Sequence, residues 1–256
     1  MKLIRNPRVY LLGRQQVDAS ELDRFLRENE LSWTTDTEIG AERLCEVAGR
    51  VCYMSFGKGR KTNEEYLGNI IGMGHGSVLE HATWNLLFTG VSRSFTHELV
   101  RHRAGFGYSQ LSQRYVDEST ADFVEPDCIA DDPELHAIWL DAVQHCHTAY
   151  RQLVDGLDRK FASEPSATLR RKLARQAARS ILPNATETKI FVTGNGRAWR
   201  HFMEMRGSEH AETEIRLVAL QVLRVLQRES ASIFGDYRIE TLEGGIEVIR
   251  TEHPKV

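Results

Sequence analysis

The residues best suited to chemistry lie close together between Arg101 and Tyr115, in the segment RHRAGFGYSQLSQRY. Three of them, Arg101, His102 and Arg103, are consecutive, and two glycines, two serines and a further arginine follow. Arginine forks bind phosphate or carboxylate bidentately, and serine hydroxyls with glycine-exposed amides complete such sites. The segment is therefore predicted to bind an anion.

A second dense group of polar side chains lies about ninety residues further along the chain. Its members carry amide, guanidinium and imidazole groups: Asn195, Arg197, His201, Arg206 and His210. On a helix, Arg197, His201 and Met205 would share one face, with Arg206 beside it. The alternative interpretation is a helix with surface ion pairs, such as Arg200 with Glu204, which would explain Arg200 but not the rest of the group.

The basic segment over residues 166–179 has a simpler interpretation. Its cations are spread over several helix faces, and for Arg170, Arg171 and Lys172 we favour a solvated surface. Arg179 differs because it borders the apolar residues 181–183, where an unpaired cation would need a partner. A nucleic-acid-binding role for this segment is the rival hypothesis.

Composition limits the classes of ligand. The chain has 256 residues, 41% of them hydrophobic, and 33 basic against 36 acidic side chains give a formal charge of −3. A general nucleic-acid binder usually carries a net basic face, so none is predicted here. A local positive site in a nearly balanced protein suits a small anionic ligand.

Several familiar chemistries are missing from the sequence. There is no GxSxG, P-loop or HExxH motif, and the glycine pairs at 72–74 and 105–107 lack the third glycine of a Rossmann fingerprint. His75 and His81, even with His97 or His102, have no carboxylate at a familiar metal-site spacing. We therefore predict no metal, although a zinc hydrolase is a further rival hypothesis.

The cysteines and the hydrophobic runs predict a cytoplasmic protein. Cys45, Cys52, Cys128 and Cys146 form no CxxC pair, and Cys52 lies on an apolar helix face, as a structural thiol would. The first residues lack a signal-peptide core, and no apolar run approaches the 18 residues or so that span a membrane. Reduced thiols and no membrane are expected.

Hydrophobic periodicity predicts one α+β domain over residues 1–256, with an antiparallel or mixed sheet flanked by long helices. Strands are expected over residues 2–12 (an edge strand), 81–90 and 186–193. Helices are expected over residues 18–28, 42–53, 62–71, 132–158, 166–179, 196–205 and 211–226. Thr62 should cap the helix over 62–71, and on the helix over 132–158 Trp139, Val143 and Tyr150 should share a face with Leu153 and Leu157. A further helix from Ser92 should carry His97 and Glu98 and deliver residues 101–103 near its C-terminus. Residues 115–123 should be extended, and 240–256 partly mobile or bound to a partner.

Three ordered blocks resemble the flavin-dependent thymidylate synthases. Residues 74–81 (GHGSVLEH) resemble the family's histidine loop, and residues 101–103 followed by 112–115 (SQRY) resemble its signature. Residues 179–183, 195–197, Arg206, His210 and 214–216 resemble its C-terminal block. Together the blocks cover residues 40–225.

The resemblance implies a homotetramer that holds FAD at subunit interfaces without a Rossmann fold. NADPH would reduce the flavin, and 5,10-methylenetetrahydrofolate would pass its methylene group to carbon 5 of dUMP. The reduced flavin would supply the hydride, giving dTMP without an enzyme cysteine nucleophile. The alternative is a UMP C5-methylase of the same fold that serves specialised nucleoside biosynthesis.

The resemblance also implies which residues meet the flavin and the folate. His75, Ser77 and Glu80 match the loop that approaches the flavin, and His75 would also face the folate. The signature residues Arg101, His102 and Arg103 would bind the flavin. Four more would reach it from another subunit: Asn195, Arg197, His201 and His210.

Six residues match positions around the nucleotide: Glu98, Gln110, Ser112, Arg114, Arg179 and Arg206. Ser112 and Arg114 would bind its phosphate, and Arg179 would pair with the polar edge of the pyrimidine. Arg206 would orient or polarise the ring. The resemblance thus assigns the reaction itself to Arg206, Ser112 and His75.

The chain departs from the family in the spacing of the signature. The stretch from Ala104 to Leu111 is one residue longer than usual. Gly105 and Gly107 are predicted to absorb the extra residue because glycine tolerates positive φ. The insertion also leaves a ribonucleotide substrate open.

Overall fold

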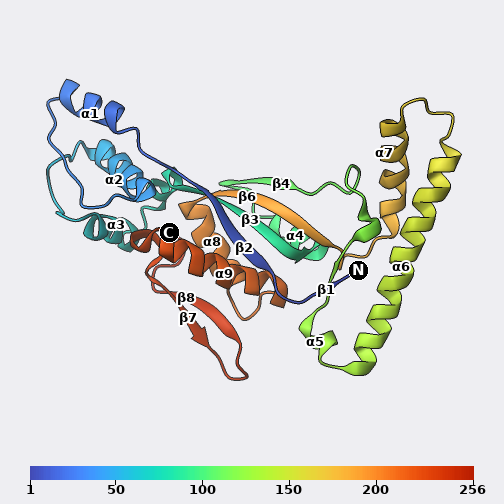
Figure 1. The fold of residues 1–256 in the computed structure, drawn as a ribbon. Coiled ribbons are helices and arrows are strands. Elements are labelled where there is room, and N and C mark those ends of the chain that lie inside the picture. Colours follow the sequence, from blue (N-terminus) through green and yellow to red (C-terminus); the bar gives the residue numbers. More distant parts are fainter. The chain divides into compact units, whose positions relative to one another are not determined.

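The computed structural model describes residues 1–256 and has an α+β fold built on a four-stranded sheet (Figure 1). The strand order is β2-β3-β6-β4, and the bounds are Arg8–Arg14 for β2, Thr83–Ser92 for β3, Glu187–Asn195 for β6 and Phe106–Gln110 for β4. Strand β1 (Leu3–Ile4) pairs in parallel with β5 (Phe123–Val124), and β7 (Tyr237–Thr241) pairs antiparallel with β8 (Glu247–Thr251). The α+β class and a mixture of strand directions are confirmed.

The expected strands differ from the observed ones at their ends. The segment predicted over residues 2–12 divides into β1 and β2, with Pro7 in the interruption, and β2 lies at the edge of the sheet as predicted. The strand predicted from His81 begins at Thr83 because His81 still belongs to a short 3-10 helix, η1 (Gly76–His81). Strand β4 was not predicted, since its glycine-rich sequence lacks strand periodicity.

The chain divides into two compact units, and the division passes through the strands of the four-stranded sheet. The larger unit covers residues 9–87, 100–108 and 191–256, and the smaller covers 1–8, 88–99 and 109–190. A single domain stays a prediction.

The larger unit holds helices around an aromatic and aliphatic core. Its helices are α1 (Ala19–Glu28), α2 (Gly40–Tyr53), α3 (Asn63–Gly72), α8 (Gly196–Arg206), α9 (Thr213–Glu229) and α10 (Ala231–Phe234). Trp84 and Trp199 are 1% and 0% exposed, and the Trp84 ring meets Phe234 edge-on with centroids 5.3 Å apart. Thr62 caps α3 by accepting a hydrogen bond from the Glu65 N–H at 3.2 Å, as the sequence predicts.

Residues 240–256, which were expected to be partly mobile or to lie on a partner, pack against their own chain. They form most of the β7–β8 hairpin, in which Tyr237 pairs with Thr251, and the chain end at Val256 is buried. Arg200 on α8, fully buried, donates to both Asp236 carboxylate oxygens at 2.7 and 2.8 Å and to the His253 carbonyl. The hairpin is therefore fixed to α8.

The same contacts exclude the expected surface pair between Arg200 and Glu204. Glu204 instead accepts a hydrogen bond from the Tyr237 hydroxyl at 2.8 Å. The guanidinium of Arg200 also lies 4.6 Å from the centre of the Tyr237 ring. The sequence spacing indicated that Arg200 pairs with a neighbour on its own helix, whereas its partner, Asp236, is 36 residues away.

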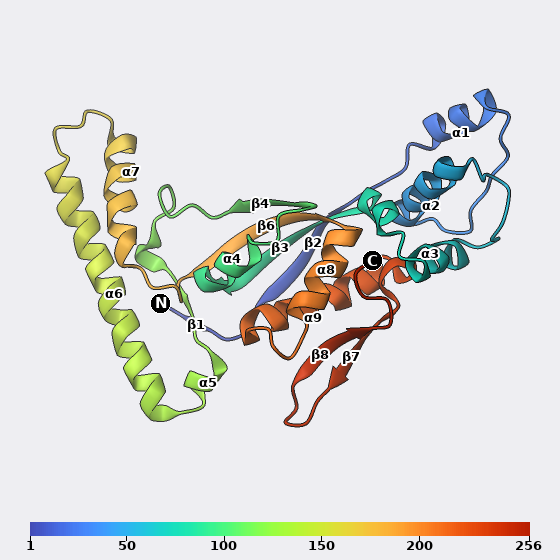
Figure 2. The ribbon, with the colours of Figure 1, turned by 180° about the vertical axis from the view of Figure 1, so that it is seen from behind.

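The smaller unit contains a long helical hairpin (Figures 1 and 2). Helix α6 (Pro133–Lys160) and helix α7 (Ala167–Ala178) lie side by side. Asp132 caps α6 through the Glu134 and Leu135 N–H groups, and Ser166 caps α7 through Leu169. The shorter elements of this unit are α4 (Arg93–Leu99), η2 (Glu118–Thr120), α5 (Asp127–Ala130) and η3 (Arg179–Ile181).

The core of the smaller unit lies beside α6. Phe123 and Val143 are 0% and 3% exposed and pack with Trp139, and Tyr150 is fully buried. These α6 residues follow the helical face that the sequence predicts. None of the helices in the structure is both long enough and apolar enough to cross a membrane.

Candidate active site

The signature cations lie just beyond the helix that was expected to deliver them. Helix α4 carries His97 and Glu98 and ends at Leu99, and Arg101 to Gly105 lead from it into β4. Residues 101–103 therefore lie near the C-terminus of this helix, as predicted, but outside it. In a turn, consecutive side chains point in different directions, which suits contacts with different parts of one ligand.

Gly105 accommodates the extra residue of the signature. Its φ is +74°, and a Cβ there would lie 2.7 Å from the Asn195 side chain and 2.8 Å from the Cβ of Ala198. The Asn195 N–H donates to the Gly105 carbonyl at 3.1 Å, and the Asn195 side chain caps α8 through the Ala198 N–H at 2.8 Å. Gly107 has no positive φ and lies within β4, so Gly105 alone plays the predicted role.

Aromatic contacts attach the same turn to α8. The Phe106 ring meets Trp199 edge-on with centroids 4.8 Å apart, and it stacks on Tyr108 at 5.9 Å. His102 meets Phe202 edge-on at 5.4 Å. The turn and α8 therefore form one packed structure that orients the cations.

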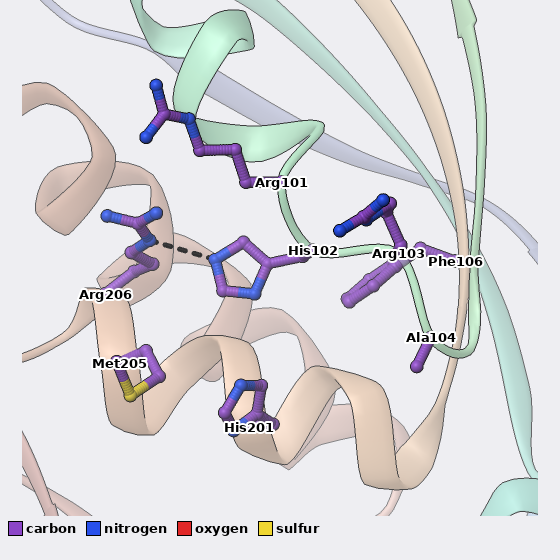
Figure 3. A pocket seen from close by; sticks show the side chains of 8 residues that line it. All are labelled: Arg101, His102, Arg103, Ala104, Phe106, His201, Met205 and Arg206. Atoms are coloured by element: carbon purple, nitrogen blue, oxygen red, sulfur yellow. Dashed lines mark hydrogen bonds between the residues drawn. The ribbon is translucent and has the colours of Figure 1, made fainter.

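A cavity of about 430 Å³ opens between this turn and α8 (Figure 3). Its lining comes from the turn and from the predicted face of α8: Arg101, His102, Arg103, Ala104, Phe106, His201, Met205 and Arg206. Its volume is within the range of about 300–1,000 Å³ that small-molecule sites occupy. Three arginines beside aromatic and aliphatic side chains suit a ligand with anionic groups and a planar ring.

His102 and Arg206 form the central contact of this cavity. The Arg206 Nε–H donates to His102 Nε2 at 2.9 Å (Figure 3). Burial, the Arg206 charge and His201 together lower the pKa of His102 to about 4. His102 is therefore a neutral imidazole near pH 7, with its proton on Nδ1 and its Nε2 lone pair directed to Arg206.

Two smaller cavities continue from the first. One of about 220 Å³ shares Ala104 and His201 with it and also contacts Glu80, Asn195 and Arg197. The third, of about 310 Å³, shares Arg197 and is lined by residues of the histidine loop, including His75 and Ser77. A short ion pair, Arg197 Nη1 to Glu80 Oε1 at 2.7 Å, lies where the second and third cavities meet.

The structure thus brings together nine of the ten residues predicted to contact the flavin or folate, together with Arg206. The exception is His210, which is exposed in the turn between α8 and α9 and lines none of these cavities. The donor set suits a flavin dinucleotide, because arginines can neutralise its diphosphate and the aromatic wall can meet a ring. The structure contains no group of three or more His, Cys, Asp or Glu side chains that could hold a metal ion.

The other residues predicted around the nucleotide belong to the smaller unit. Glu98 lies on α4, Gln110 ends β4, Ser112 and Arg114 follow it, and Arg179 begins η3. The Gln110 side-chain amide donates to the Thr96 hydroxyl at 3.1 Å, which fixes its orientation. None of these five residues lines the three cavities described above.

Ser112 begins a compact turn. The Tyr115 and Val116 N–H groups donate to the Ser112 carbonyl at 3.1 and 2.9 Å, and the helix η2 follows. The prediction of an extended segment over residues 115–123 is therefore wrong for its first half. A turn that bonds back on Ser112 leaves the side chains of Ser112 and Arg114 on one short, rigid segment.

Two further arginines, which the sequence does not single out, hold this turn. Arg175 on α7 donates to the Tyr115 carbonyl at 2.8 Å and to Asp117 at 3.0 Å. Arg93 at the start of α4 donates to the Leu111 carbonyl at 3.4 Å, directly before Ser112. Arg175 belongs to the basic segment that the sequence shows, but its partner Tyr115 lies 60 residues away, so spacing could not indicate the contact.

The solvated face expected for residues 170–172 is correct only in part. Arg171 is exposed, whereas Arg170 Nε pairs with Asp158 at 3.0 Å. Lys172 Nζ lies 5.2 Å from the centre of the Tyr115 ring, and Arg114 lies 5.5 Å from the same centre. The inner side of α7 therefore supports the segment that follows Ser112.

Comparison with known proteins agrees with this arrangement. Residues 35–230 match the model of the family described as thymidylate synthase complementing protein. Flavin-dependent thymidylate synthases from Mycobacteroides abscessus and Mycobacterium avium are each 52% identical over 227 residues, 88% of this chain and 90% of theirs. A solved UMP/dUMP methylase from Streptomyces cacaoi, bound with 5-Br dUMP, shares the fold with a TM-score of 0.67, 17% identity and 92% and 96% coverage. The chain therefore belongs to the thymidylate synthase complementing protein family.

Proposed function

We propose that this chain is a flavin-dependent thymidylate synthase that methylates dUMP reductively to dTMP. The observation that carries the proposal is the set of adjoining cavities lined by nine residues predicted to meet the flavin or folate. Relatives 52% identical over most of the chain bear this name. The one-carbon donor in the proposal is 5,10-methylenetetrahydrofolate, and the reductant is NADPH.

FAD is the proposed cofactor, and when bound it supplies the hydride that completes the methyl group. Arg101, Arg103 and Arg197 would neutralise its phosphates through bidentate hydrogen bonds. Asn195 and Gly105 keep the backbone of the turn and of α8 close together, so the cavity is formed before the cofactor arrives. Ser77 and Glu80 would contact the flavin from the histidine loop, and His75 would face the folate.

The nucleotide residues have separate proposed roles. Ser112 and Arg114 would bind the phosphate from one rigid turn, and Arg179 would pair with the polar edge of the pyrimidine. Arg206 would polarise a uracil carbonyl and stabilise the charge that develops there during methylene transfer. Glu98 and Gln110 would complete the binding of the nucleotide.

The neutral state of His102 supports this role for Arg206. A neutral imidazole accepts the Arg206 Nε–H and so fixes the plane of the guanidinium that would face a substrate oxygen. A protonated histidine could not accept this hydrogen bond, and it would add a like charge. The lowered pKa of His102 therefore keeps the arginine oriented at neutral pH.

The assembly and location are also proposals. We propose a homotetramer in which Asn195, Arg197, His201 and His210 of one subunit reach a flavin bound by the signature of another. A subunit interface would give His210, which lines no cavity of its own chain, a ligand to contact. Four unpaired cysteines favour a cytoplasmic location.

A visible absorption spectrum with and without dUMP tests flavin and nucleotide together. The purified protein should be yellow, and dUMP should perturb the flavin bands. Colourless protein that cannot be reconstituted with FAD would contradict the proposal.

A tritium-release assay with 5-tritiated dUMP and UMP compares the two candidate substrates. We expect release from dUMP, because the most similar relatives described above are thymidylate synthases. Release from UMP alone would favour the nucleoside-biosynthesis methylase instead.

A further inference from the structure

Glu118 is a buried carboxyl group with no assigned role. The residue is 5% exposed, and its Oε1 has no hydrogen-bond partner. Its backbone is fixed on both sides, because its N–H donates to the Tyr150 hydroxyl at 3.3 Å and its carbonyl accepts from His147 at 3.1 Å. An ionised carboxylate is costly to bury without a partner, so its retention here calls for an explanation.

The position of Glu118 connects it to the candidate phosphate segment. It follows Arg114 by four residues, just after the turn that begins at Ser112. Arg93, whose guanidinium donates to the Leu111 carbonyl before Ser112, lies within electrostatic range of Glu118. Arg179 is close enough to Arg93 for the two like charges to oppose one another.

The charges facing Glu118 come from every neighbouring element. Arg93 is on α4, Glu187 and Lys189 are on β6, Asp117 precedes it, Arg175 is on α7, and His147 and Tyr150 are on α6. Most of them are already engaged: Lys189 pairs with Glu187 at 3.0 Å, and Arg175 pairs with Asp117 at 3.0 Å. The positive charge of Arg93 is therefore the main one left to balance Glu118.

We propose that binding of the nucleotide's dianionic phosphate is coupled to the uptake of one proton from solvent by the Glu118 carboxylate. The coupling rests on the proposed function, in which dUMP binds through Ser112 and Arg114. Before binding, ionised Glu118 balances the charge of Arg93, whose guanidinium donates to the Leu111 carbonyl directly before Ser112. When the phosphate binds at Ser112, its charge takes over that role, and a second negative charge beside Arg93 becomes unfavourable.

In the free protein the Glu118 carboxyl group can gain or lose its proton near neutral pH. Burial raises its pKa to about 7, against the opposing effect of Arg93. A nearby dianion raises the pKa further because it disfavours the ionised form. By linkage, a ligand that raises the pKa of a group binds more tightly where that group can take up a proton.

Isothermal titration calorimetry of the FAD-loaded enzyme with dUMP, in buffers of different ionisation enthalpy at pH 7.5, measures the proton uptake. The nucleotide phosphate is then mostly dianionic, because its second pKa is about 6. We expect wild-type enzyme to take up roughly half a proton and Glu118→Gln close to none. Between pH 7 and 8.5 the Kd for dUMP should rise on the order of fivefold in wild type and stay flat in the variant.

Matched controls separate Glu118 from its surroundings. Asp141→Asn removes an exposed carboxylate on α6, which pairs with His145 and does not face Glu118, and should leave the proton uptake at the wild-type value. Glu118→Asp keeps a titrating carboxyl and should retain uptake even if Glu118→Gln folds poorly. Deoxyuridine, which has no phosphate, should bind without proton uptake.

The results distinguish the coupling from the function on which it rests. Tight dUMP binding with no proton uptake in wild type, or equal uptake in wild type and Glu118→Gln, would overturn the coupling and leave the proposed function intact. FAD-loaded wild-type enzyme that binds no dUMP would overturn both.

Discussion

The flavin-side cavities and the phosphate segment handle positive charge in different ways. On the flavin side, Arg197 pairs with Glu80 at 2.7 Å and Arg206 donates to neutral His102 at 2.9 Å. In the phosphate segment, Arg93 donates only to a carbonyl and faces a carboxyl group whose Oε1 has no partner. A direct hydrogen bond fixes the orientation of an arginine side chain. A negative charge that balances an arginine only through space can be replaced by the negative charge of a bound ligand.

This difference fits the proposed roles of the two regions, a resident cofactor in one and an exchanging substrate in the other. A cofactor that stays bound gains from a preformed cavity, because ordering is completed during folding. A substrate that binds and leaves in every turnover gains from a site that can change its own charge when the charged substrate arrives. The predictions below test each side of that comparison, in order of expected effect.

The largest effect should come from the support beneath α8. Asp236→Ala would leave the fully buried Arg200 without its carboxylate, and removing one partner of a buried pair costs about 3–5 kcal/mol. Urea unfolding should show this loss in the free energy of unfolding. Glu247→Ala, which removes the exposed partner of Arg224, should cost less than about 1 kcal/mol. Equal stability of the two variants would contradict a preformed flavin side.

Arg206→Ala should reduce methylation by a factor of about 100–1,000, the usual cost of removing a donor to developing charge. FAD should remain bound, because Arg101, Arg103 and Arg197 still line the cavities. Steady-state assays and the flavin spectrum measure the two properties separately. Arg224→Ala, an exposed arginine on α9, is the control. Full activity in Arg206→Ala would refute the assigned role.

Gly105→Ala should weaken FAD binding roughly thirtyfold, since a forced positive φ costs about 1–3 kcal/mol. The new Cβ would also press against Asn195 and Ala198, 2.7 and 2.8 Å away. Titration of apoprotein with FAD, followed by flavin fluorescence, measures the change. Gly107→Ala is a close control, because its Cβ would meet only Thr193 at 3.9 Å. If both variants bind FAD equally well, Gly105 does not shape the cavity.

Ser112→Ala should raise the KM for dUMP about tenfold while turnover persists, because one hydrogen bond to a charged group contributes about 1.5–3 kcal/mol. Ser109→Ala, on the exposed side of β4, serves as the comparison. Loss of all turnover with unchanged dUMP binding would instead indicate that Ser112 acts as a nucleophile.

The sequence predicts most helices and the polar face of α8 because both depend on local spacing. The i, i+4, i+8 face of Arg197, His201 and Met205 lines the cavities as expected, and the cap of Thr62 on α3 is confirmed. The resemblance supplied the residue roles, which spacing alone could not. Gly105 has the positive φ that the longer signature predicts for one of its two glycines.

The failures concern partners that are distant in sequence. Arg200 lies 36 residues from Asp236, Arg175 lies 60 from Tyr115, and the β7–β8 hairpin is stable because α8 anchors it. Glu118 carried no signal, because a single acidic residue in a polar segment is ordinarily exposed. Only the fold shows that it is buried beside Arg93.

The smallest predicted effect concerns the pH dependence of stability, where the two regions should act in opposite directions. The pKa of His102 is lowered to about 4, so the unfolded chain binds more protons below about pH 6.5 and His102 makes stability rise with pH over that range. The pKa of Glu118 is raised from 4.5 to about 7, so the folded protein binds more protons and Glu118 makes stability fall with pH between those values.

In wild type the two slopes should partly cancel between about pH 4.5 and 6.5. Glu118→Gln removes the falling component, so its free energy of unfolding should rise more steeply with pH than that of wild type, by a slope of up to one proton. Urea unfolding at half-unit pH intervals measures this difference, with Asp141→Asn, which removes an exposed carboxylate on α6, as the control. Identical slopes in wild type and Glu118→Gln would mean that Glu118 is ionised throughout, and the charge difference between the two regions would then disappear.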